Sequence, residues 1–521
     1  MKKAIFVIGM LVTTAIATIA MTNNYKEYNP ISFENAIKVE PNIIKLGPTS
    51  ANQGNVLITE NSPEDDYLPF MTIDPAGNIV VTWSHQVSAI ESYFGFAYSS
   101  DGSVWNGYLL QLEGMAWYSS LGRVTAPEFT GLYGVYLYAS PEGETHGFYL
   151  LPDITDSSTW QVYYWIPGDE CDFKYTYVDD DCIYENKDYG LSFLAMEIFH
   201  EIYGGYDIPD CPILMYTLAD LSGGVFYFDA QSRLATAPAS YPAMANTPQY
   251  MHLVWSYYDG SHYKLVYKKI DPLVEPDIEY TEWQFYLDEG DFDCRYADAD
   301  AVGSNVYVVY CTNENGNWDI FLQYSNDDGN TWTKKQVTSS PNDELYPAIY
   351  VSGNTIYLAY VMNNDLYFTK STDAGNTWDE PAKINDVDGS VSMEERAVDI
   401  CSRGIVWVDT RNGNRDIYFS TFPAPIISIE KISGGFGVKA TVANVGTLPA
   451  ENVQWTVELE GLVFIGKRTE GTIDVLNPGE SVNVGPSFVL GIGPVTITAT
   501  ADGASKTASG FMLGPFVLGV S

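Results

Sequence analysis

Short apolar runs separated by turn residues follow one another along most of the chain. In the segment 343–385 the runs are bounded by Gly, Asn and Ser, a pattern typical of β-strands joined by tight turns. It predicts strands at 346–351, 355–361, 365–370 and after Trp378. The preceding segment, 294–337, has the same order of runs, and 395–422 repeats the first three. The chain is therefore expected to repeat a four-stranded unit.

Weaker copies of this unit lie upstream, at 65–107, 123–165, 173–230 and 241–270. The last copy lacks a fourth strand, whereas the segment 54–60 has no partner of its own. If 54–60 completes the last copy, the ring has no free edge. The sequence therefore predicts an all-β fold with a β-propeller over 54–422. Seven blades are favoured, and six are the alternative if 123–230 forms one blade with excursions.

After residue 422 the pattern changes, because aromatic residues become rarer and Val, Thr and Gly dominate. Alternating strands with short turns are expected over 438–461 and 471–503. This density of strands predicts an immunoglobulin-like β-sandwich over 423–521. We expect a spacer or stabilising role for it rather than direct ligand binding.

One motif, Ser-x-Asp-x-Gly-Asn-Thr-Trp, occurs twice, and a shortened copy occurs once. Its residues are Ser325, Asp327, Gly329 and Trp332, then Ser371, Asp373, Gly375 and Trp378, and in the shortened copy Ser99, Asp101 and Trp105. It falls in the turn between the third and fourth expected strands. Ser and Asp can bond nearby backbone amides, Gly allows a positive φ, and Trp can pack on the sheet. We therefore expect a structural role.

The motif resembles the Asp-box of the sialidase-like, BNR-repeat propellers, and the resemblance covers residues 54–422 as a fold. It implies that these turns lie away from any catalytic pocket. An active member of that family grips a sugar carboxylate with three arginines and uses a Tyr nucleophile, a Glu and an Asp acid/base. The family's Arg-Ile-Pro signature is absent here. The stretch 444–455 resembles adhesion-type Ig-like modules of surface proteins.

Candidate site residues come from the two loop types that share one face of a propeller. Three arginines are expected at starts of first strands, with a glutamate beside the last one: Arg123, Arg295, Arg396 and Glu395. The loops after the second strands carry His85, Tyr258, His262, Trp318, Asp409 and Arg411. Such groups suit stacking on sugars and hydrogen bonding to them. The alternative is structural: the arginines pair with nearby carboxylates, and Asp409 with Arg411 fastens adjacent blades.

The charge balance limits the partners. With 67 acidic against 26 basic residues, the net charge is −41. Such a charge repels phosphates, so nucleic acid and anionic membrane surfaces are excluded as main partners. Asp386 and Asp388 are spaced as alternate oxygen ligands before a Gly turn, which makes structural Ca²⁺ an option, although the EF-hand loop is incomplete. No cofactor is required.

The N-terminus has the pattern of an export signal. Lys2 and Lys3 precede an uncharged apolar stretch, 4–20. We predict a signal peptide over 1–22, an extension over 23–53, and a secreted or cell-surface protein that is not integral to the membrane after cleavage. An uncleaved anchor is the alternative.

The chain contains six cysteines, which can pair in an exported protein. A Cys294–Cys311 disulfide is predicted because these residues occupy neighbouring ends of an expected strand pair. Cys171, Cys182, Cys211 and Cys401 have no assigned partner.

Two functions are therefore open. The favoured one is a non-catalytic binding or scaffold module for an extracellular glycan or surface protein, because no recognisable catalytic set is present. The alternative is a sialidase-like exo-glycosidase acting on terminal acidic sugars. Convergence of the three arginines on one site distinguishes the two.

Overall fold

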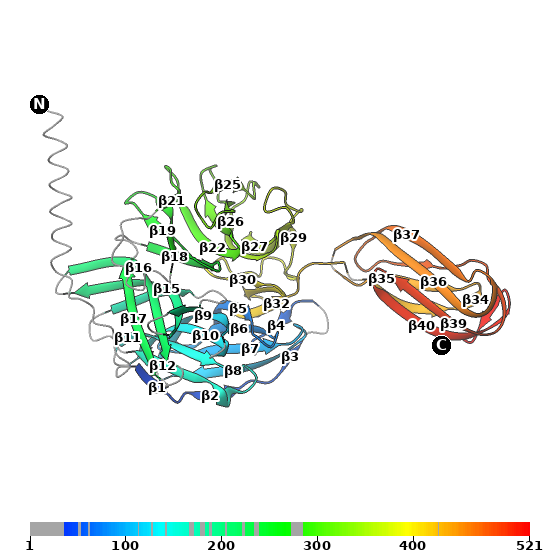
Figure 1. The fold of residues 1–521 in the computed structure, drawn as a ribbon, viewed down its shortest axis with the longest axis horizontal. Coiled ribbons are helices and arrows are strands. Elements are labelled where there is room, and N and C mark those ends of the chain that lie inside the picture. Colours follow the sequence, from blue (N-terminus) through cyan, green and yellow to red (C-terminus); the bar gives the residue numbers. More distant parts are fainter. Residues whose placement is uncertain are drawn as a thin grey trace, which may run out of the picture. The chain divides into compact units, whose positions relative to one another are not determined.

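Among the residues that the computed structural model describes, nearly all regular secondary structure is β-strand (Figure 1). The described residues are 36–50, 54–60, 63–112, 114–126, 129–140, 143–165, 171–177, 183–186, 190–203, 206–220, 225–233, 239–271, 285–425, 427–446 and 448–520. The predicted signal, 1–22, lies outside this set. Within it, no helix is long and apolar enough to span a membrane. Contacts divide the chain into two units, residues 1–421 and 422–521.

The described residues of the first unit form seven antiparallel sheets. Three of them coincide with the clearest sequence repeats. The first has β22 (Cys294–Val302), β23 (Asn305–Thr312), β24 (Asp319–Ser325) and β25 (Thr333–Gln336). The second has β26 (Glu344–Ser352), β27 (Thr355–Met362), β28 (Asp365–Ser371) and β29 (Ala382–Lys383). The third has β30 (Val398–Cys401), β31 (Gly404–Asp409), β32 (Asp416–Ser420) and, beside β32, β4 (Val56–Leu57).

The other four sheets come from residues 36–288. One has β5 (Asp65–Ile73), β6 (Ile79–Ser88), β7 (Glu91–Ser99) and β8 (Val104–Gln111), with β2 (Asn42–Lys45) and β3 (Thr49–Ser50) beside β8. The next has β9 (Met115–Thr125), β10 (Thr130–Ser140), β11 (Gly143–Leu151), β12 (Gln161–Trp165) and β1 (Ala36–Val39), with a 3-10 turn at Ser157–Thr159. A third has β13 (Cys171–Tyr177), β14 (Ile183–Asn186), β15 (Gly190–Tyr203), β16 (Tyr206–Asp220) and β17 (Val225–Arg233). The fourth has β18 (Ala239–Asn246), β19 (Met251–Tyr258), β20 (Tyr263–Ile270) and β21 (Phe285–Asp288).

The sheets close into a propeller, as the repeats predict. β4 supplies the fourth strand of the last sheet by pairing Val56 with Phe419 and Leu57 with Tyr418. The first strands contact one another in the cyclic order β5, β9, β13, β18, β22, β26, β30 and again β5. This order favours the seven-bladed prediction over the six-bladed one.

The second strand of each blade explains why the sheets stack. In β6, β19 and β31 a run of six successive residues is buried, although side chains alternate between the two faces of a strand. Continuous apolar runs are expected where both faces of a strand are covered. Each run includes a fully buried tryptophan: Trp83, Trp255 or Trp407.

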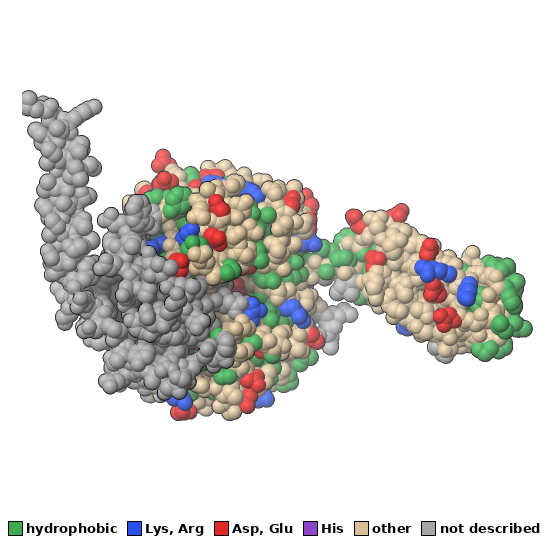
Figure 2. All heavy atoms as spheres, viewed as in Figure 1, with side chains coloured by type: hydrophobic (Ala, Val, Ile, Leu, Met, Phe, Trp, Pro, Cys, Tyr) green, Lys and Arg blue, Asp and Glu red, His purple; other side chains and the backbone are tan. Residues whose placement is uncertain are grey.

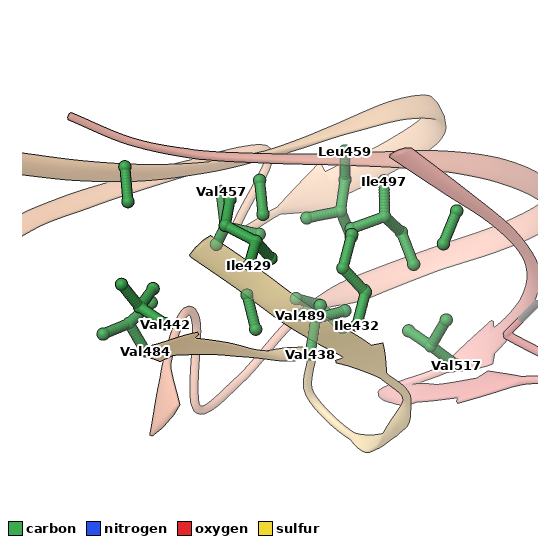
Figure 3. Packing of buried hydrophobic residues seen from close by; sticks show 14 of the residues in the cluster. Ile429, Ile432, Val438, Val442, Val457, Leu459, Val484, Val489, Ile497 and Val517 are labelled. Carbon is green, nitrogen blue, oxygen red and sulfur yellow. The ribbon is translucent and has the colours of Figure 1, made fainter. Parts of the chain in front are cut away.

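The second unit is a two-sheet sandwich. One sheet has β33 (Ile427–Ser433), β35 (Lys439–Asn444) and β38 (Ser481–Val484). The other has, in order, β34 (Gly435–Phe436), β41 (Phe516–Leu518), β40 (Ala504–Gly514), β39 (Leu490–Ala501), β36 (Ala450–Ile465) and β37 (Arg468–Leu476). Val457, Leu459 and Ile497 of the larger sheet pack with Ile429 and Ile432 of the smaller one (Figure 3). The immunoglobulin-like topology stays a prediction.

The larger sheet of this unit is also apolar on its outer face at one end. Ile492 pairs with Leu513, which pairs in turn with Phe516, and all three are about half exposed. Space-filling shows hydrophobic side chains gathered at that end of the unit (Figure 2).

The predicted disulfide is not formed. Cys294 lies opposite Thr312, and Cys311 lies opposite Arg295. This one-residue offset sends the two thiols to opposite faces of the sheet, because successive side chains alternate. Both thiols are buried, in two different apolar clusters, and neither they nor Cys401 belong to a disulfide among the described residues. The side chains of Cys171, Cys182 and Cys211 lie outside the described set.

Candidate functional site

The first strands of the propeller share an unusual backbone feature. A non-glycine residue with a left-handed conformation recurs at one place in six of these strand segments: Leu68, Tyr118, Tyr241, Tyr296, Tyr346 and Arg396, with φ between +52° and +56°. In five of them a β-bulge shifts the register at this residue. A bulge re-aims side chains, and such φ values are costly for residues other than glycine. Strain repeated around a ring points to a function there.

Four of these residues, Tyr241, Tyr296, Tyr346 and Arg396, line a pocket to which the first-strand segments of five blades contribute, and which we call the axial pocket. The rings of Tyr241 and Tyr296 lie 4.6 Å apart between centroids, and those of Tyr296 and Tyr346 lie 4.7 Å apart. Three aromatic rings from three successive blades therefore form part of one wall. Short side chains from the Pro347–Ala348 step and from Ala297 leave room beside them.

Carboxyl groups complete the lining. Asp298 Oδ2 accepts a hydrogen bond from the Ile349 amide nitrogen at 2.8 Å. Asp399 Oδ2 accepts one from the Met71 amide nitrogen at 2.6 Å. Each of these bonds joins one first strand to the first strand of the next blade. Burial, reinforced by the nearby charge of Asp298, raises the pKa of Asp399 to about 8. The Asp399 carboxyl therefore keeps its proton at neutral pH, while it holds two blades together beside the pocket.

Two guanidinium groups lie in or near the pocket, those of Arg396 and Arg415. Arg396 lines the pocket, donates to the Pro242 carbonyl oxygen at 2.7 Å and lies 5.7 Å from the centroid of the Tyr118 ring. Arg415 lies between Glu394, at 3.2 Å, and Asp65, at 3.1 Å. Burial alone lowers the pKa of Arg415, but these carboxylates outweigh it and the pKa is raised.

The three predicted arginines do not converge. Arg396 and Glu395 line the pocket. Arg295 instead pairs with Asp293 at 2.8 Å. Arg123 lies near the far end of β9, opposite Leu132, because that strand begins at Met115 and not at the glycine before Arg123. The prediction that all three arginines start first strands is wrong for Arg123.

The residues predicted in the loops near Arg295 form a cluster on the rim that adjoins the pocket tyrosines: ring centroids are 6.2 Å apart for Tyr263 and Tyr241, and 6.5 Å apart for Trp318 and Tyr296. Arg295 lies over the rings of Tyr263, at 4.2 Å, and Trp318, at 5.6 Å. His262 is 3.5 Å from the carboxylate of Asp293, the partner of Arg295, and Tyr258 packs 5.0 Å from Tyr263. None of the residues of this rim cluster belongs to the pocket lining.

His85 belongs to a buried hydrogen-bond group. The Asp66 carboxylate lies 2.7 Å from His85 Nδ1 and accepts from Trp83 Nε1 at 2.7 Å. Burial lowers the pKa of His85, but the hydrogen bond and charge of Asp66 outweigh burial and raise it. These contacts hold the first strand of the blade to the second, so His85 is structural.

Asp409 and Arg411 form the ion pair that the structural interpretation predicts. Asp409 is fully buried and accepts from Trp407 Nε1 at 2.9 Å and Ser390 Oγ at 2.7 Å, and from Arg411 at 2.7 Å. Arg411 also pairs with Asp386 and reaches Asn55 Oδ1 at 3.4 Å. The group thus ties the loop after β29 and the segment before β4 to the last blade.

The predicted calcium pair is engaged with cations instead. Asp386 pairs with Arg411 at 2.5 Å, and Asp388 pairs with Lys383. The described part of the chain holds no group of three or more His, Cys, Asp or Glu side chains arranged for a metal ion. Asp386 and Asp388 therefore bind side chains of the protein in this structure, and a calcium ion at these residues stays a prediction.

The Ser-Asp-Gly-Trp motifs form closed turns, as predicted. Gly329 N donates to Ser325 Oγ at 2.9 Å, and Asp327 accepts from the Thr331 amide at 2.8 Å. The second copy repeats these bonds at 2.8 Å each, from Gly375 to Ser371 and from Thr377 to Asp373. In the shortened copy Gly102 donates to Ser99 and Ser103 donates to Asp101.

The tryptophans of these turns pack across blades. Trp332 meets Tyr267 of the preceding blade edge-on, with centroids 4.9 Å apart, and Trp105 meets Phe419 of the last blade at 5.0 Å. Trp378 packs against an apolar cluster that its own blade shares with the preceding blade. None of the motif residues lines the pocket.

The sequence predicts Arg396 and Glu395 as site residues, and both line the pocket, but it does not single out the pocket tyrosines. Each of the pocket's three tyrosines is the third residue of a first strand, within "SYPA", "RYAD" and "LYPA". The recurrence of Tyr before Pro or Ala is the signal that could have located them. Asp298 and Asp399 carry no such signal, because their partners lie in other blades.

Comparison with known proteins gives likenesses of fold only. No protein-family model and no curated protein matches the sequence. Among solved structures, the polysaccharide lyase Uly1 is 12% identical, with 74% of this chain and 99% of that chain covered and a TM-score of 0.45. The Penicillium chrysogenum α-L-arabinanase complexed with arabinobiose is 11% identical, covering 71% and 98%, with a TM-score of 0.37. The Hadza microbial sialidase Hz136 is 14% identical, covering 61% and 66%, with a TM-score of 0.37. Likenesses of this size carry no argument about substrate or reaction.

Proposed function

We infer that this chain is an exported or cell-surface binding protein whose propeller holds the end of a glycan in the axial pocket without cleaving it. The observation that carries this is the joint placement of three tyrosine rings with carboxyl groups in one pocket. Aromatic faces provide apolar contact for sugar rings, and carboxylates accept strong hydrogen bonds from hydroxyl groups. The second unit serves as a spacer, and no cofactor is needed.

Sialidase-type catalysis is less well supported. That chemistry requires three arginines around one sugar carboxylate, and of the predicted three only Arg396 lines the pocket. In addition, Asp298 and Asp399 are each bonded to a backbone amide of the next blade. Both carboxyl groups thus have structural partners that a reacting acid or nucleophile does not need.

One observation favours hydrolysis as a second candidate. Asp399 keeps its proton near neutral pH because its pKa is raised to about 8, and it lines the pocket together with Glu395. A protonated carboxyl beside a second carboxylate is the arrangement that glycosidases use.

The test begins with a glycan array, followed by calorimetric titration of the best ligand. Tyr346→Ala should weaken binding about tenfold or more, because it removes a central aromatic contact. Tyr350→Ala is the matched control, since Tyr350 lies on the same strand and packs on Tyr357 outside the pocket. Equal affinities of the two variants, or no binding to any glycan, would contradict the proposal.

The same protein should be tested on a panel of chromogenic glycosides. A flat trace is expected. Turnover that disappears in Glu395→Gln and in Asp399→Asn would instead establish the hydrolase.

A further inference from the structure

The charges around the axial pocket are unequal. Its lining includes the carboxyl groups of Asp298 and Glu395, the protonated carboxyl group of Asp399, and one guanidinium group, that of Arg396. Just beside it, Glu394 and Asp65 share the single guanidinium of Arg415. Acidic groups therefore outnumber basic ones both in the pocket and next to it, within a chain of net charge −41.

The nearby cations are already engaged with oxygen atoms of the protein. Arg396 donates to the Pro242 carbonyl, Arg415 bridges two carboxylates, and Arg295 pairs with Asp293. An acidic sugar entering the pocket would have to compete for these guanidinium groups while it approaches carboxyl groups. This arrangement opposes recognition of a carboxylate.

The aromatic wall has the opposite preference. The faces of aromatic rings carry negative charge density and attract cations by roughly 0.5–2 kcal/mol. Elsewhere in this propeller, tyrosine faces hold cations repeatedly: Arg411 lies 4.1 Å from the centroid of Tyr418, and Arg415 lies 4.5 Å from that of Tyr67. Tyr241, Tyr296 and Tyr346 bring three such rings to one pocket together with carboxyl groups.

We propose that the pocket recognises a sugar carrying a protonated amine, and so selects amino sugars over neutral and acidic ones. This inference rests on the proposed glycan-binding function and specifies its ligand class. The ammonium group lies against the tyrosine faces and close to Glu395, and the sugar hydroxyls meet the remaining polar groups. The charge that opposes an acidic ligand attracts this one.

The test uses three tetrasaccharides that differ in charge: tetramers of glucosamine, of N-acetylglucosamine and of galacturonic acid. Titration calorimetry of the full chain at low salt should show the glucosamine tetramer binding about tenfold more tightly than the N-acetyl tetramer. The galacturonate tetramer should bind most weakly. The preference for the amine should shrink as salt is raised, because salt screens charge.

A pair of variants locates the effect. Glu395→Gln keeps the shape of the side chain and removes its charge, so the affinity for the glucosamine tetramer relative to that for the N-acetyl tetramer should fall about fivefold. Glu380→Gln removes the same charge from an exposed position outside the pocket and should leave the preference as it was. Thermal melting checks that both variants fold. The salt series is measured on the unmodified protein, so it tests the charge preference even if a variant does not fold.

The outcomes separate this inference from the function beneath it. If the N-acetyl or galacturonate tetramer binds as tightly as the glucosamine tetramer, the charge preference is refuted and glycan binding stands. If no tetramer binds and the glycan array is also empty, glycan binding itself is refuted, and the inference with it.

Discussion

Two carboxylates on opposite ends of the propeller strands behave in opposite ways. Asp373, in a turn, is held by the amides of Asn376 and Thr377 and by the Thr377 hydroxyl, and these bonds lower its pKa to about 2. Asp399, at the pocket, is bonded to Met71 across the ring closure, and burial raises its pKa to about 8. The carboxylate of the turn accepts hydrogen bonds from residues close to it in sequence, whereas the carboxyl group of the pocket accepts one from another blade.

The largest expected effect comes from the pocket carboxylate. A folded pKa above the unfolded value of 3.8 means that the folded state keeps a proton that the unfolded state loses. Asp399 therefore costs stability progressively as pH rises from about 4 to about 8, and the cost is constant above that. Asp399→Asn cannot ionise, so its stability relative to the unmodified protein should rise over this window by on the order of a few kcal/mol. Urea unfolding at pH 5 and pH 8.5 measures it.

If the difference between Asp399→Asn and the unmodified protein is the same at both pH values, Asp399 ionises normally and the comparison with Asp373 fails.

The second effect concerns the tight packing of a turn against its neighbour. Gly329 has φ +71°, and a Cβ there would lie 1.9 Å from Tyr267 Oη. Gly329→Ala should therefore lose about 3 kcal/mol of unfolding free energy, from backbone strain plus overpacking. Gly353→Ala is the control, because Gly353 has φ +60° and nothing within 4 Å of its added Cβ. It should lose only the backbone part, about 1 kcal/mol. Equal losses in urea titrations of the two variants would show that the contact with Tyr267 contributes nothing.

The smallest expected effect comes from Asp373, whose pKa is shifted in the opposite direction to that of Asp399. The pKa of Asp373 is lowered to about 2 in the folded state. Its charge therefore stabilises the folded protein at pH values above 3.8, the pKa in the unfolded state. That contribution is lost as pH falls towards 2. Asp373→Asn should lower the melting temperature at pH 7 and have little effect at pH 2. A pH-independent change in melting temperature would show that the lost hydrogen-bond geometry, not the charge, matters.

The contrast between turns and pocket also explains which features could be predicted from the sequence. The turn motifs, the repeated strands and the closing segment were predictable, because each depends on neighbouring residues or on an alternation that recurs. β4 was found as an unpaired strand, and it pairs with β32 as expected.

The pocket was not predictable in the same way. Its lining comes from segments as far apart as residues 69 and 399, and its ties join different blades. Arg123 was misplaced because the blade that contains it begins earlier than its repeat suggests, and the cysteine pair failed on a one-residue register. Register and blade contacts are properties of the folded chain.

The most direct test of the central claim, that the pocket between the first strands binds the ligand, is hydrogen exchange with and without the best glycan. The account predicts slower amide exchange in 241–243, 296–299, 346–349 and 395–399, and unchanged exchange in the turns 325–332 and 371–378. Protection confined to those turns, to the rim around Arg295 or to the second unit would contradict it.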